Sequence, residues 1–305
     1  MKRGDNGIRE PMQRRHSNSM KSNTRIANDV NRAKYEARGA ATGRWMSMLA
    51  RLGYAVKGVL YLVIGLLAAQ LAFSSGGKAT DQRGAIQTIS DLPFGIFLLV
   101  VMTIGLFGFA IWCFIQALFD TEGKGRSAKG IIARIGYAVV GISYIALGFG
   151  AFQYVAGSGT AGKSSTTSTQ DWTAQLLKQP PGTALVVLVG LVVLGVAFYL
   201  FSKAYTARFQ SRLNLTELSA QLKKLVVGLG RFGYAALGVL FSIIGIFLIV
   251  AAVQHNSSKA IGLDGALREL TLQPFIPPLL GIVALGLVAY GVYSFAEARY
   301  RRIGR

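Results

Sequence analysis

Residues 51–61 read Arg51-Leu-Gly-Tyr-Ala-Val-Lys-Gly-Val-Leu-Tyr61, and two close copies of this stretch follow later in the chain. The second copy runs Arg134-Ile-Gly-Tyr-Ala-Val-Val-Gly-Ile-Ser-Tyr144, and the third runs Arg231-Phe-Gly-Tyr-Ala-Ala-Leu-Gly-Val-Leu-Phe241. All three fit the pattern R-x-G-Y-A-x-x-G-x-x-[YF], and each opens a long apolar block. Self-similarity of this kind predicts a protein built from three tandem copies of one supersecondary unit.

Apolar residues fill six long blocks, two in each copy. Hydrophobic residues make up 52% of the 305 residues and charged residues 15%, against about 25% charged in soluble domains. Runs of about 18 or more apolar residues are typical of transmembrane helices, whereas a β-barrel needs short alternating strands. We therefore predict an all-α integral membrane protein with six transmembrane helices. The blocks lie near 54–73, 94–118, 136–156, 183–203, 233–253 and 276–296.

The two blocks of each copy are expected to form a helical hairpin. We predict a basic N-terminal tail at 1–45 and hairpin repeats at 46–125, 126–210 and 211–305. Because all three hairpins start from the same side, they are parallel repeats, and we expect a pseudo-threefold arrangement about an axis along the membrane normal. A short segment ending in proline precedes each second helix and predicts a brief interfacial helix. These segments are Ala85–Pro93, Trp172–Pro181 and Ala266–Pro278.

The placement of the charge predicts the orientation. The net charge is +20, and 27 of the 33 Lys and Arg residues fall in the N-terminal part, the connections between copies and the C-terminus. The positive-inside rule then places both termini in the cytoplasm. We expect the excess charge to face anionic lipid headgroups, not nucleic acid, because no nucleic-acid-binding motif accompanies it. Residues 25–42 are open to two interpretations, a surface helix ahead of Trp45 or a disordered tail.

Aromatic residues and glycines alternate along the first helix of each copy. Tyr54, Gly58, Tyr61 and Gly65 are spaced by four, three and four residues, which places them on one helical face. Small residues let helices approach closely in lipid, so we predict that this stripe is a helix-packing face; a face that contacts a ligand is the alternative. The equivalent positions are Tyr137, Gly141, Tyr144 and Gly148 in the second copy and Tyr234, Gly238, Phe241 and Gly245 in the third.

The second helices carry stripes of the same kind. We expect aromatic side chains of one helix to enter the glycine notches of its neighbour. The stripes are Gly105, Phe109, Trp112, Cys113 and Gln116 in the first copy; Gly195, Tyr199, Ser202 and Thr206 in the second; and Gly286, Tyr290, Tyr293 and Glu297 in the third.

Polar residues near the helix ends are the candidates for a functional role. They are Arg51, Lys57, Arg134, Arg231, Gln116 and Glu297. An ionisable residue inside a span is normally paired or lines a pathway. We interpret Lys57 as a side chain that reaches the cytoplasmic interface, with a functional role as the alternative. Glu297 is expected to pair with one of the three arginines of the repeated openings.

The sequence contains no recognisable catalytic constellation. His16 and His255 are isolated, and the single cysteine, Cys113, lies inside a span. We therefore predict no catalytic residues, no metal site, no cofactor and no enzymatic activity. Asp81 and Asp91 are interpreted as solvated loop residues.

One segment matches a nucleotide-binding pattern by spacing alone. Gly157-Ser-Gly-Thr-Ala-Gly-Lys-Ser164 fits the P-loop consensus G-x4-G-K-[ST]. A P-loop follows a buried strand and opens a helix, so that backbone N–H groups surround the phosphates. This segment instead leaves a predicted transmembrane helix on the outer side, and we interpret it as a flexible linker.

The thrice-repeated opening with paired spans resembles the bacterial membrane family known as domain of unknown function 1206. The similarity covers roughly residues 45–303, and the third copy departs from it by carrying Phe241 in place of a tyrosine. The resemblance implies a location in the bacterial inner membrane and a fold of three hairpins. It implies no activity.

Two functional hypotheses follow. The first is a non-enzymatic structural or accessory subunit of a membrane assembly, with lipids and other membrane proteins as partners. The second is a channel or passive transporter for a small solute or ion along the pseudo-threefold axis. Coupled proton transport usually needs a carboxylate within the membrane, and the 13 acidic residues lie almost wholly outside the apolar blocks. A packed axis favours the first hypothesis and a water-filled axis the second.

Overall fold

The computed structural model describes residues 44–73, 77–119, 127–159, 162–216, 218–272 and 277–301. Residues 25–42, for which a surface helix and a disordered tail are the two interpretations, lie outside this part of the chain. The described residues are helical or in turns and loops, and an isolated antiparallel bridge between Leu213 and Arg301 is the only β pairing among them.

Six helices are long and apolar enough to cross a membrane, as predicted, and the chain is a multi-pass membrane protein. A helix satisfies its own backbone hydrogen bonds, which lipid cannot do. Ser127 and Ser219 cap the third and fifth of these helices by accepting hydrogen bonds from the backbone N–H groups of Gly130 and Leu222. The six are α2 (Arg44–Phe73), α4 (Gly95–Phe119), α5 (Ala128–Val155), α7 (Gly182–Thr206), α8 (Ala220–Val253) and α10 (Pro277–Tyr300).

A short helix joins the two spanning helices of each repeat. These are α3 (Gln82–Ser90), α6 (Ser165–Leu177) and α9 (Leu263–Leu272). Each begins before the segment predicted for it, because Asp81 caps α3 and Ser164 caps α6 ahead of the apolar residues. Two 3₁₀ turns, η1 (Arg208–Arg212) and η2 (Ser257–Lys259), follow α7 and α8. We call the ends of the spanning helices that adjoin α3, α6 and α9 their cap ends.

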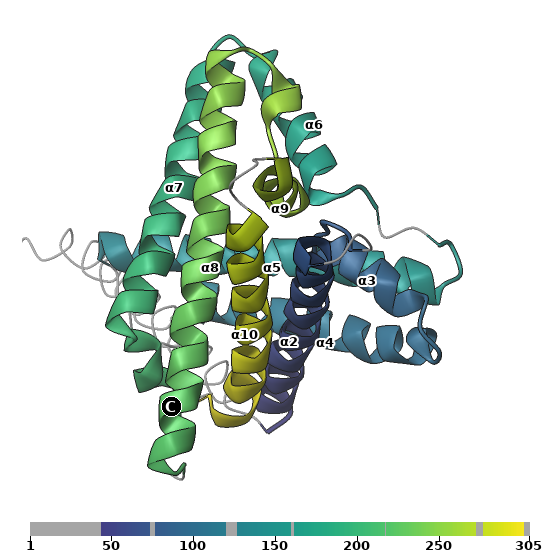
Figure 1. The fold of residues 1–305 in the computed structure, drawn as a ribbon, viewed down its shortest axis with the longest axis vertical. Coiled ribbons are helices and arrows are strands. Elements are labelled where there is room, and N and C mark those ends of the chain that lie inside the picture. The colour runs from purple at the N-terminus through teal and green to yellow at the C-terminus, as the bar shows by residue number, and fades with distance from the viewer. Residues whose placement is uncertain are drawn as a thin grey trace, which may run out of the picture.

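The spanning helices contact one another in an open series, and α4 and α5 run across the direction of the other four (Figure 1). α4 contacts α5 and α2, α10 contacts α2 and α8, and α8 contacts α7. α5 and α7 are therefore the two ends of this series of contacts although they belong to one repeat; Figure 1 shows α8 beside α7 and α10 beside α2. A pseudo-threefold arrangement requires α5 to pack on α7 as α2 packs on α4 and α8 on α10, and this part of the prediction is not confirmed.

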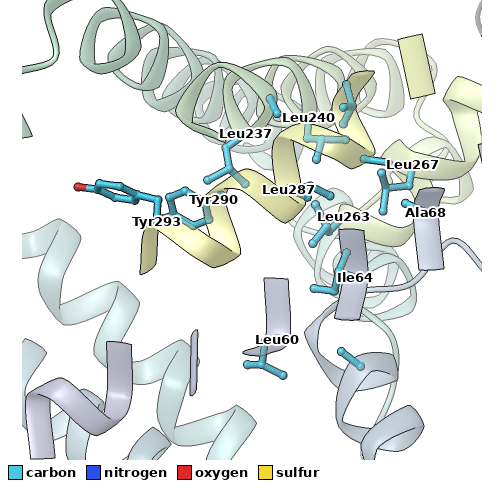
Figure 2. Packing of buried hydrophobic residues seen from close by; sticks show 14 of the residues in the cluster. Leu60, Ile64, Ala68, Leu237, Leu240, Leu263, Leu267, Leu287, Tyr290 and Tyr293 are labelled. Atoms are coloured by element: carbon cyan, nitrogen blue, oxygen red, sulfur yellow. The ribbon is translucent and has the colours of Figure 1, made fainter. Parts of the chain in front are cut away.

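The main core lies where α2, α8, α9 and α10 meet. Leu60 and Ile64 of α2, Leu240 of α8, Leu267 of α9 and Leu287 of α10 are fully buried there (Figure 2). Removing apolar side chains from lipid gains little hydrophobic energy, so close van der Waals packing is what stabilises contacts of this kind between spanning helices.

Glycines of α2 set its distance from α10. A Cβ atom built on Gly58 would lie 2.9 Å from the Phe295 ring, and one on Gly65 would lie 2.7 Å from the backbone nitrogen of Val288. Only glycine allows so close an approach. The same positions of the other repeats join Gly141 and Gly148 of α5 to Phe114 and Phe107 of α4, and Gly238 and Gly245 of α8 to Phe201 and Leu194 of α7.

A second set of glycine contacts lies inside the repeats. A Cβ on Gly53 would lie 2.3 Å from Cβ of Phe109, and one on Gly233 would lie 2.6 Å from Cβ of Tyr290. Gly136, the equivalent residue of α5, has no atom within 4 Å of such a Cβ, and Tyr199 of α7 is exposed. The stripes predicted on the second helices thus pack against the first helix of the same repeat in the first and third repeats, but not in the second.

The glycine contacts give a stability prediction with a matched control. Gly65→Ala places a methyl group against the backbone of α10, and we expect it to lower the free energy of unfolding by about 1–3 kcal/mol through overpacking. Gly136→Ala, in the open face of α5, is expected to be neutral or to stabilise by up to about 1 kcal/mol through helix propensity. Denaturant unfolding of both variants in detergent micelles measures the difference, and equal effects would contradict the packing role of Gly65.

Candidate functional site

Four polar residues of α10 and its C-terminal end share one face. Tyr290, Ser294, Glu297 and Arg301 follow one another at spacings of four, three and four residues, which aligns them along a helix. α2 packs against α10 and presents Lys57, which lies midway along that helix. The contact between the first and third repeats therefore contains a group of ionisable side chains.

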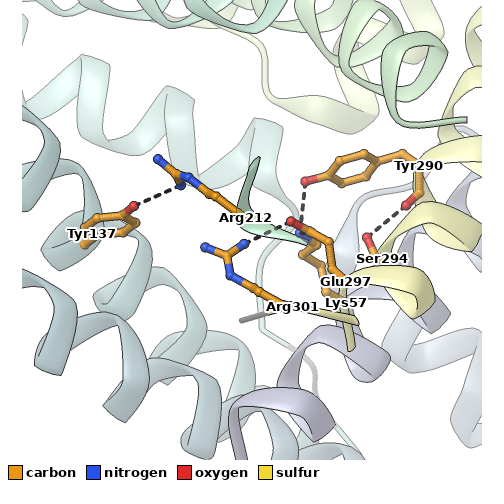
Figure 3. A network of polar contacts seen from close by, with 7 residues as sticks. All are labelled: Lys57, Tyr137, Arg212, Tyr290, Ser294, Glu297 and Arg301. Carbon is orange, nitrogen blue, oxygen red and sulfur yellow. Dashed lines mark hydrogen bonds and ion pairs between the residues drawn. The ribbon is translucent and has the colours of Figure 1, made fainter. Parts of the chain in front are cut away.

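Lys57, Glu297 and Arg301 form a buried ion cluster, and Lys57 is hydrogen-bonded to Tyr290 (Figure 3). We call these four residues the charge cluster. Lys57 Nζ lies 3.1 Å from Glu297 Oε2 and donates a hydrogen bond of 3.0 Å to the Tyr290 hydroxyl. Arg301 Nη1 lies 2.9 Å from Glu297 Oε1. Lys57 is 8% exposed and Glu297 is 3% exposed, so each charge depends on its partners because solvent is excluded.

The structure corrects two interpretations drawn from the sequence. Lys57 does not extend to an interface, because it is held inside the protein by Glu297 and Tyr290. Glu297 binds Lys57 and Arg301 and none of the arginines that open the repeats. The sequence contains one signal for the cluster. When the repeats are aligned on their openings, Lys57 takes the place of Val140 and Leu237, and a lysine at an otherwise apolar position indicates a partner.

Aromatic rings surround the charge cluster. The guanidinium carbon of Arg301 lies 4.7 Å from the centre of the Tyr54 ring, and Lys57 Nζ lies 4.8 Å from the Tyr290 ring. Lys203 of α7 stands 3.8 Å from the centre of the Tyr234 ring. Cations over aromatic faces gain about 0.5–2 kcal/mol each, more when they are desolvated. Two of the three tyrosines of the repeated openings, Tyr54 and Tyr234, thus stabilise a cation of another repeat.

The connection between α7 and α8 closes over the end of α10. Leu213 pairs with Arg301 in the isolated bridge, and the backbone N–H of Asn214 donates a 2.7 Å hydrogen bond to the carbonyl of Tyr300. Phe209 of η1 is buried against Tyr234 and Tyr293. These contacts help to exclude solvent from the charge cluster, which strengthens its electrostatic interactions.

Arg134 and Arg231 bind elsewhere than in the cluster. Arg134 donates hydrogen bonds to the carbonyls of Ala117 and Leu118 at the C-terminus of α4, and Arg231 donates to the carbonyl of Ala204 near the end of α7. Carbonyls in the last turn of a helix lack partners within the helix, so these arginines tie one repeat to the end of the previous one. Arg51 is exposed, and Gln116 is buried.

A second polar network joins the three repeats at their cap ends. Asp81, at the start of α3, accepts a hydrogen bond from the backbone N–H of Ser165 in α6. Asp264 of α9 accepts from the Ser165 hydroxyl at 2.7 Å and from the Thr166 backbone at 2.9 Å. Asp81 is buried, so its interpretation as a solvated loop residue was wrong; Asp91, at the end of α3, is exposed.

Partial burial by itself would raise the pKa of the Asp264 carboxyl group. The hydrogen bonds that Ser165 and Thr166 donate to its ionised form outweigh burial and hold the pKa below the ordinary value of 3.8. The Asp264 carboxylate therefore stabilises the folded protein in its charged form.

Neither the charge cluster nor the polar network at the cap ends has the composition of a known catalytic centre. The charge cluster contains one carboxylate whose two oxygens both bind cations. In the described part of the chain, no three His, Cys, Asp or Glu residues are grouped so that they could hold a metal ion. The geometry is that of ties between repeats: one within the membrane-spanning layer and one at the cap ends.

Comparison with known proteins agrees with the repeats. The family described as Domain of Unknown Function (DUF1206) matches the chain over residues 52–120, 135–207 and 232–301, one hairpin in each segment. The "Uncharacterized protein YxxB" of Bacillus subtilis (strain 168) is 36% identical over 262 residues, which cover 86% of this chain and 94% of that protein. No solved structure matches the chain. The predicted internal repeats and the family resemblance are confirmed.

The charge cluster predicts an order of effects. Glu297→Gln removes the carboxylate that Lys57 and Arg301 share, and we expect a loss of about 3–5 kcal/mol in the free energy of unfolding. Lys57→Met leaves Glu297 paired with Arg301, and we expect a smaller loss of about 1.5–3 kcal/mol. Val140→Met, at the equivalent position of α5, is the control and should change stability by less than about 0.5 kcal/mol. Denaturant unfolding in micelles measures all three, and a larger effect of Lys57→Met would contradict the role of Glu297 as the shared anion.

The cap-end network predicts a pH dependence. The pKa of Asp264 is lowered on folding, so its contribution is complete above the unfolded value and is lost as pH falls through the folded value, that is, below about pH 4. Asp264→Asn should lower the thermal unfolding midpoint at pH 7 and reduce the fall in the midpoint between pH 5 and pH 3. Asp91→Asn, at an exposed site, is the control. A wild-type and Asp264→Asn pair with parallel pH profiles would show that Asp264 is not the group concerned.

Proposed function

The chain belongs to the family described as Domain of Unknown Function (DUF1206), and we propose that it is a non-enzymatic accessory subunit of a membrane assembly, whose second repeat holds a transmembrane helix of another protein. We place it in the bacterial inner membrane with both termini in the cytoplasm. The distribution of basic residues and the similarity to a Bacillus subtilis protein support this location. The proposal depends on one observation: α5 and α7 leave open the faces that the other repeats bury.

One face of α5 is exposed although the equivalent faces of α2 and α8 are buried. Val139 is 57% exposed, whereas Val56 of α2 is 3% exposed and Ala236 of α8 is 5% exposed at the same position of the repeat. Gly136 and Ser143 are also exposed, and their counterparts in the first and third repeats are buried. This face of the first helix is covered by the second helix of the same repeat in two repeats out of three.

The open face of α7 shows the same contrast. Tyr199 is 57% exposed, whereas Trp112 of α4 is 3% exposed and Tyr293 of α10 is fully buried. Val189, Val192 and Val196 continue the exposed face toward the cap end. Spacings of three, four and three residues place these four side chains on one side of the helix.

We infer that one substitution between repeats contributes to the opening. When the second helices are aligned on Phe114, Phe201 and Phe295, α7 carries Val192 where α4 carries Gly105 and α10 carries Gly286, so Gly195 is not their counterpart as the predicted stripes assumed. A Cβ atom built on Gly286 would lie 2.3 Å from Cβ of Ala236, and one on Gly105 would lie 2.6 Å from a methyl carbon of Val56. A β-branched residue at this position prevents α7 from approaching its own hairpin partner as closely as α4 and α10 do.

A helix from another protein fits these faces best. The equivalent faces of the other repeats are covered by a spanning helix, and Val192 keeps the chain's own helix away. Gly136 and Gly195 offer notches, since a Cβ atom built on either glycine would have no atom within 4 Å, and small residues of this kind favour association of helices in lipid. The partner is therefore expected to be a transmembrane helix that enters between α5 and α7.

A channel along the repeat axis has less support. The helices that would surround such an axis do not close, and α2, α8 and α10 meet in an aliphatic core. Tyr54 and Tyr234, which would line or flank a path, pack against Phe109 and Phe209. Glu297 binds a cation with each oxygen, which suits a structural tie better than a proton relay.

Site-specific photocrosslinking in the native membrane tests the proposal. A benzophenone amino acid at Val139 or Tyr199 should give a crosslink to one defined second protein, and the same group at Ile104, an equally exposed residue of α4, should not. Gly136→Trp fills the notch and should abolish co-purification of that protein in native mass spectrometry. The unfolding midpoint of the variant should remain within a few degrees of wild type, since the site is open.

Two results would contradict the accessory role. One is crosslinks from Ile104 as strong as those from Val139 and Tyr199, which would indicate random encounters. The other is a chain that purifies alone or as a homo-oligomer after gentle extraction. In that case the channel hypothesis would be tested by solute flux into proteoliposomes.

A further inference from the structure

The second repeat differs from the others at its cap end as well. α3 buries Ala85, Ile86 and Ile89, and α9 buries four residues including Leu267 and Leu270. Among the residues of α6 only Thr173 is buried. Buried aliphatic side chains thus fill the space beneath α3 and α9, whereas α6 packs only the partly buried Leu176 and Leu177 against the helices beneath it.

A cavity of about 300 Å³ lies between α6 and the α7/α8 pair. Its walls are aliphatic and include Val186 and Val193 of α7 and Ile244 and Leu248 of α8. These apolar walls offer water few hydrogen-bond partners and favour an apolar occupant. Since α7 and α8 span the membrane, its natural occupant is an apolar chain from the lipid.

The α6 side of the cavity contributes hydroxyl groups as well as apolar side chains. Ser168, Thr169 and Thr173 line it together with Leu176 and with Trp172, which is largely exposed. Trp is enriched at membrane–water interfaces, so the cavity opens at the depth of lipid headgroups. An occupant must therefore combine an apolar chain with a polar group at one end.

A cation stands at the polar side. Arg83 of α3 donates hydrogen bonds to the carbonyl of Lys163 and, at 3.2 Å, to the hydroxyl oxygen of Ser168. Lys163 is paired with Asp171 at 2.5 Å, so the charge of Arg83 is the one left for a ligand among these three residues. Guanidinium groups bind phosphate with good geometry.

We propose that this cavity binds one acyl chain of an anionic phospholipid, with the phosphate beside Arg83 and the hydroxyl groups of α6. The site is separate from the proposed partner site. It needs no second protein, although Val189 borders both. The lipid would fill the space that Ile and Leu side chains fill under α3 and α9, and so would complete the packing of the second repeat.

Fluorescence quenching in lipid nanodiscs tests the site on the isolated protein. A Trp45→Phe/Trp112→Phe variant retains Trp172 as its only tryptophan, in the wall of the cavity. Brominated phosphatidylglycerol should quench Trp172 at a lower mole fraction than brominated phosphatidylcholine. Arg83→Gln should reduce this preference by about fivefold, as expected for about 1 kcal/mol per basic residue at a membrane surface. Arg83→Lys should largely retain it.

Matched variants of α7 separate the cavity from the general lipid boundary. Val193→Phe fills the cavity and should abolish the preference for phosphatidylglycerol, whereas Val192→Phe, on the neighbouring exposed position, should preserve it. Native mass spectrometry should show one retained phosphatidylglycerol that is lost in Val193→Phe. Equal quenching by the two lipids, or a preference that survives both Arg83→Gln and Val193→Phe, would overturn the proposal. A failure of these tests leaves the crosslinking test of the partner site unaffected.

Discussion

The contact between α2 and α10 holds the first repeat to the third, and it contains the buried charges of Lys57, Glu297 and Arg301. An ion cluster of this kind adds little net stability compared with apolar residues of the same shape, because desolvation offsets the attraction. The cluster instead discriminates between the native arrangement and shifted ones, because a displaced helix would separate a buried charge from its partner. We therefore expect the cluster to favour one register between the two ends of the chain.

Glycine positions then decide how close each further helix can come. Gly58 and Gly65 bring α10 onto α2, and the same positions of the other repeats bring α4 onto α5 and α7 onto α8. These three contacts between repeats are all present. Within the repeats, Gly105 and Gly286 of the second helices lie against the first helix of the same hairpin, and α7 carries Val192 at that position. The missing glycine accompanies the opening of the second repeat.

Features with a regular sequence period could be predicted, and features that depend on pairing between distant residues could not. The six apolar blocks and the spacing of Gly58 and Gly65 predicted the spanning helices and a packing face. The partner of Glu297 is 240 residues away in the sequence, and no local pattern identifies it. The one indication is Lys57 itself, a lysine where the other two repeats carry Val140 and Leu237. The prediction of a pseudo-threefold arrangement assumed that the three repeats pack alike. The second repeat differs from the others at Val192, where they carry glycine.

The second repeat is where this protein departs from its own symmetry, in both spanning helices and in the short helix between them. α5 and α7 expose faces that are buried elsewhere, and α6 buries only Thr173 where α3 and α9 bury several aliphatic side chains. Loss of packing costs stability when nothing replaces it. Three coincident losses in one repeat, with the contacts of the other two intact, are best explained if ligands supply the missing contacts: a helix between α5 and α7, and a lipid chain beneath α6. The first and third repeats would then act as the frame, and the second as the binding element.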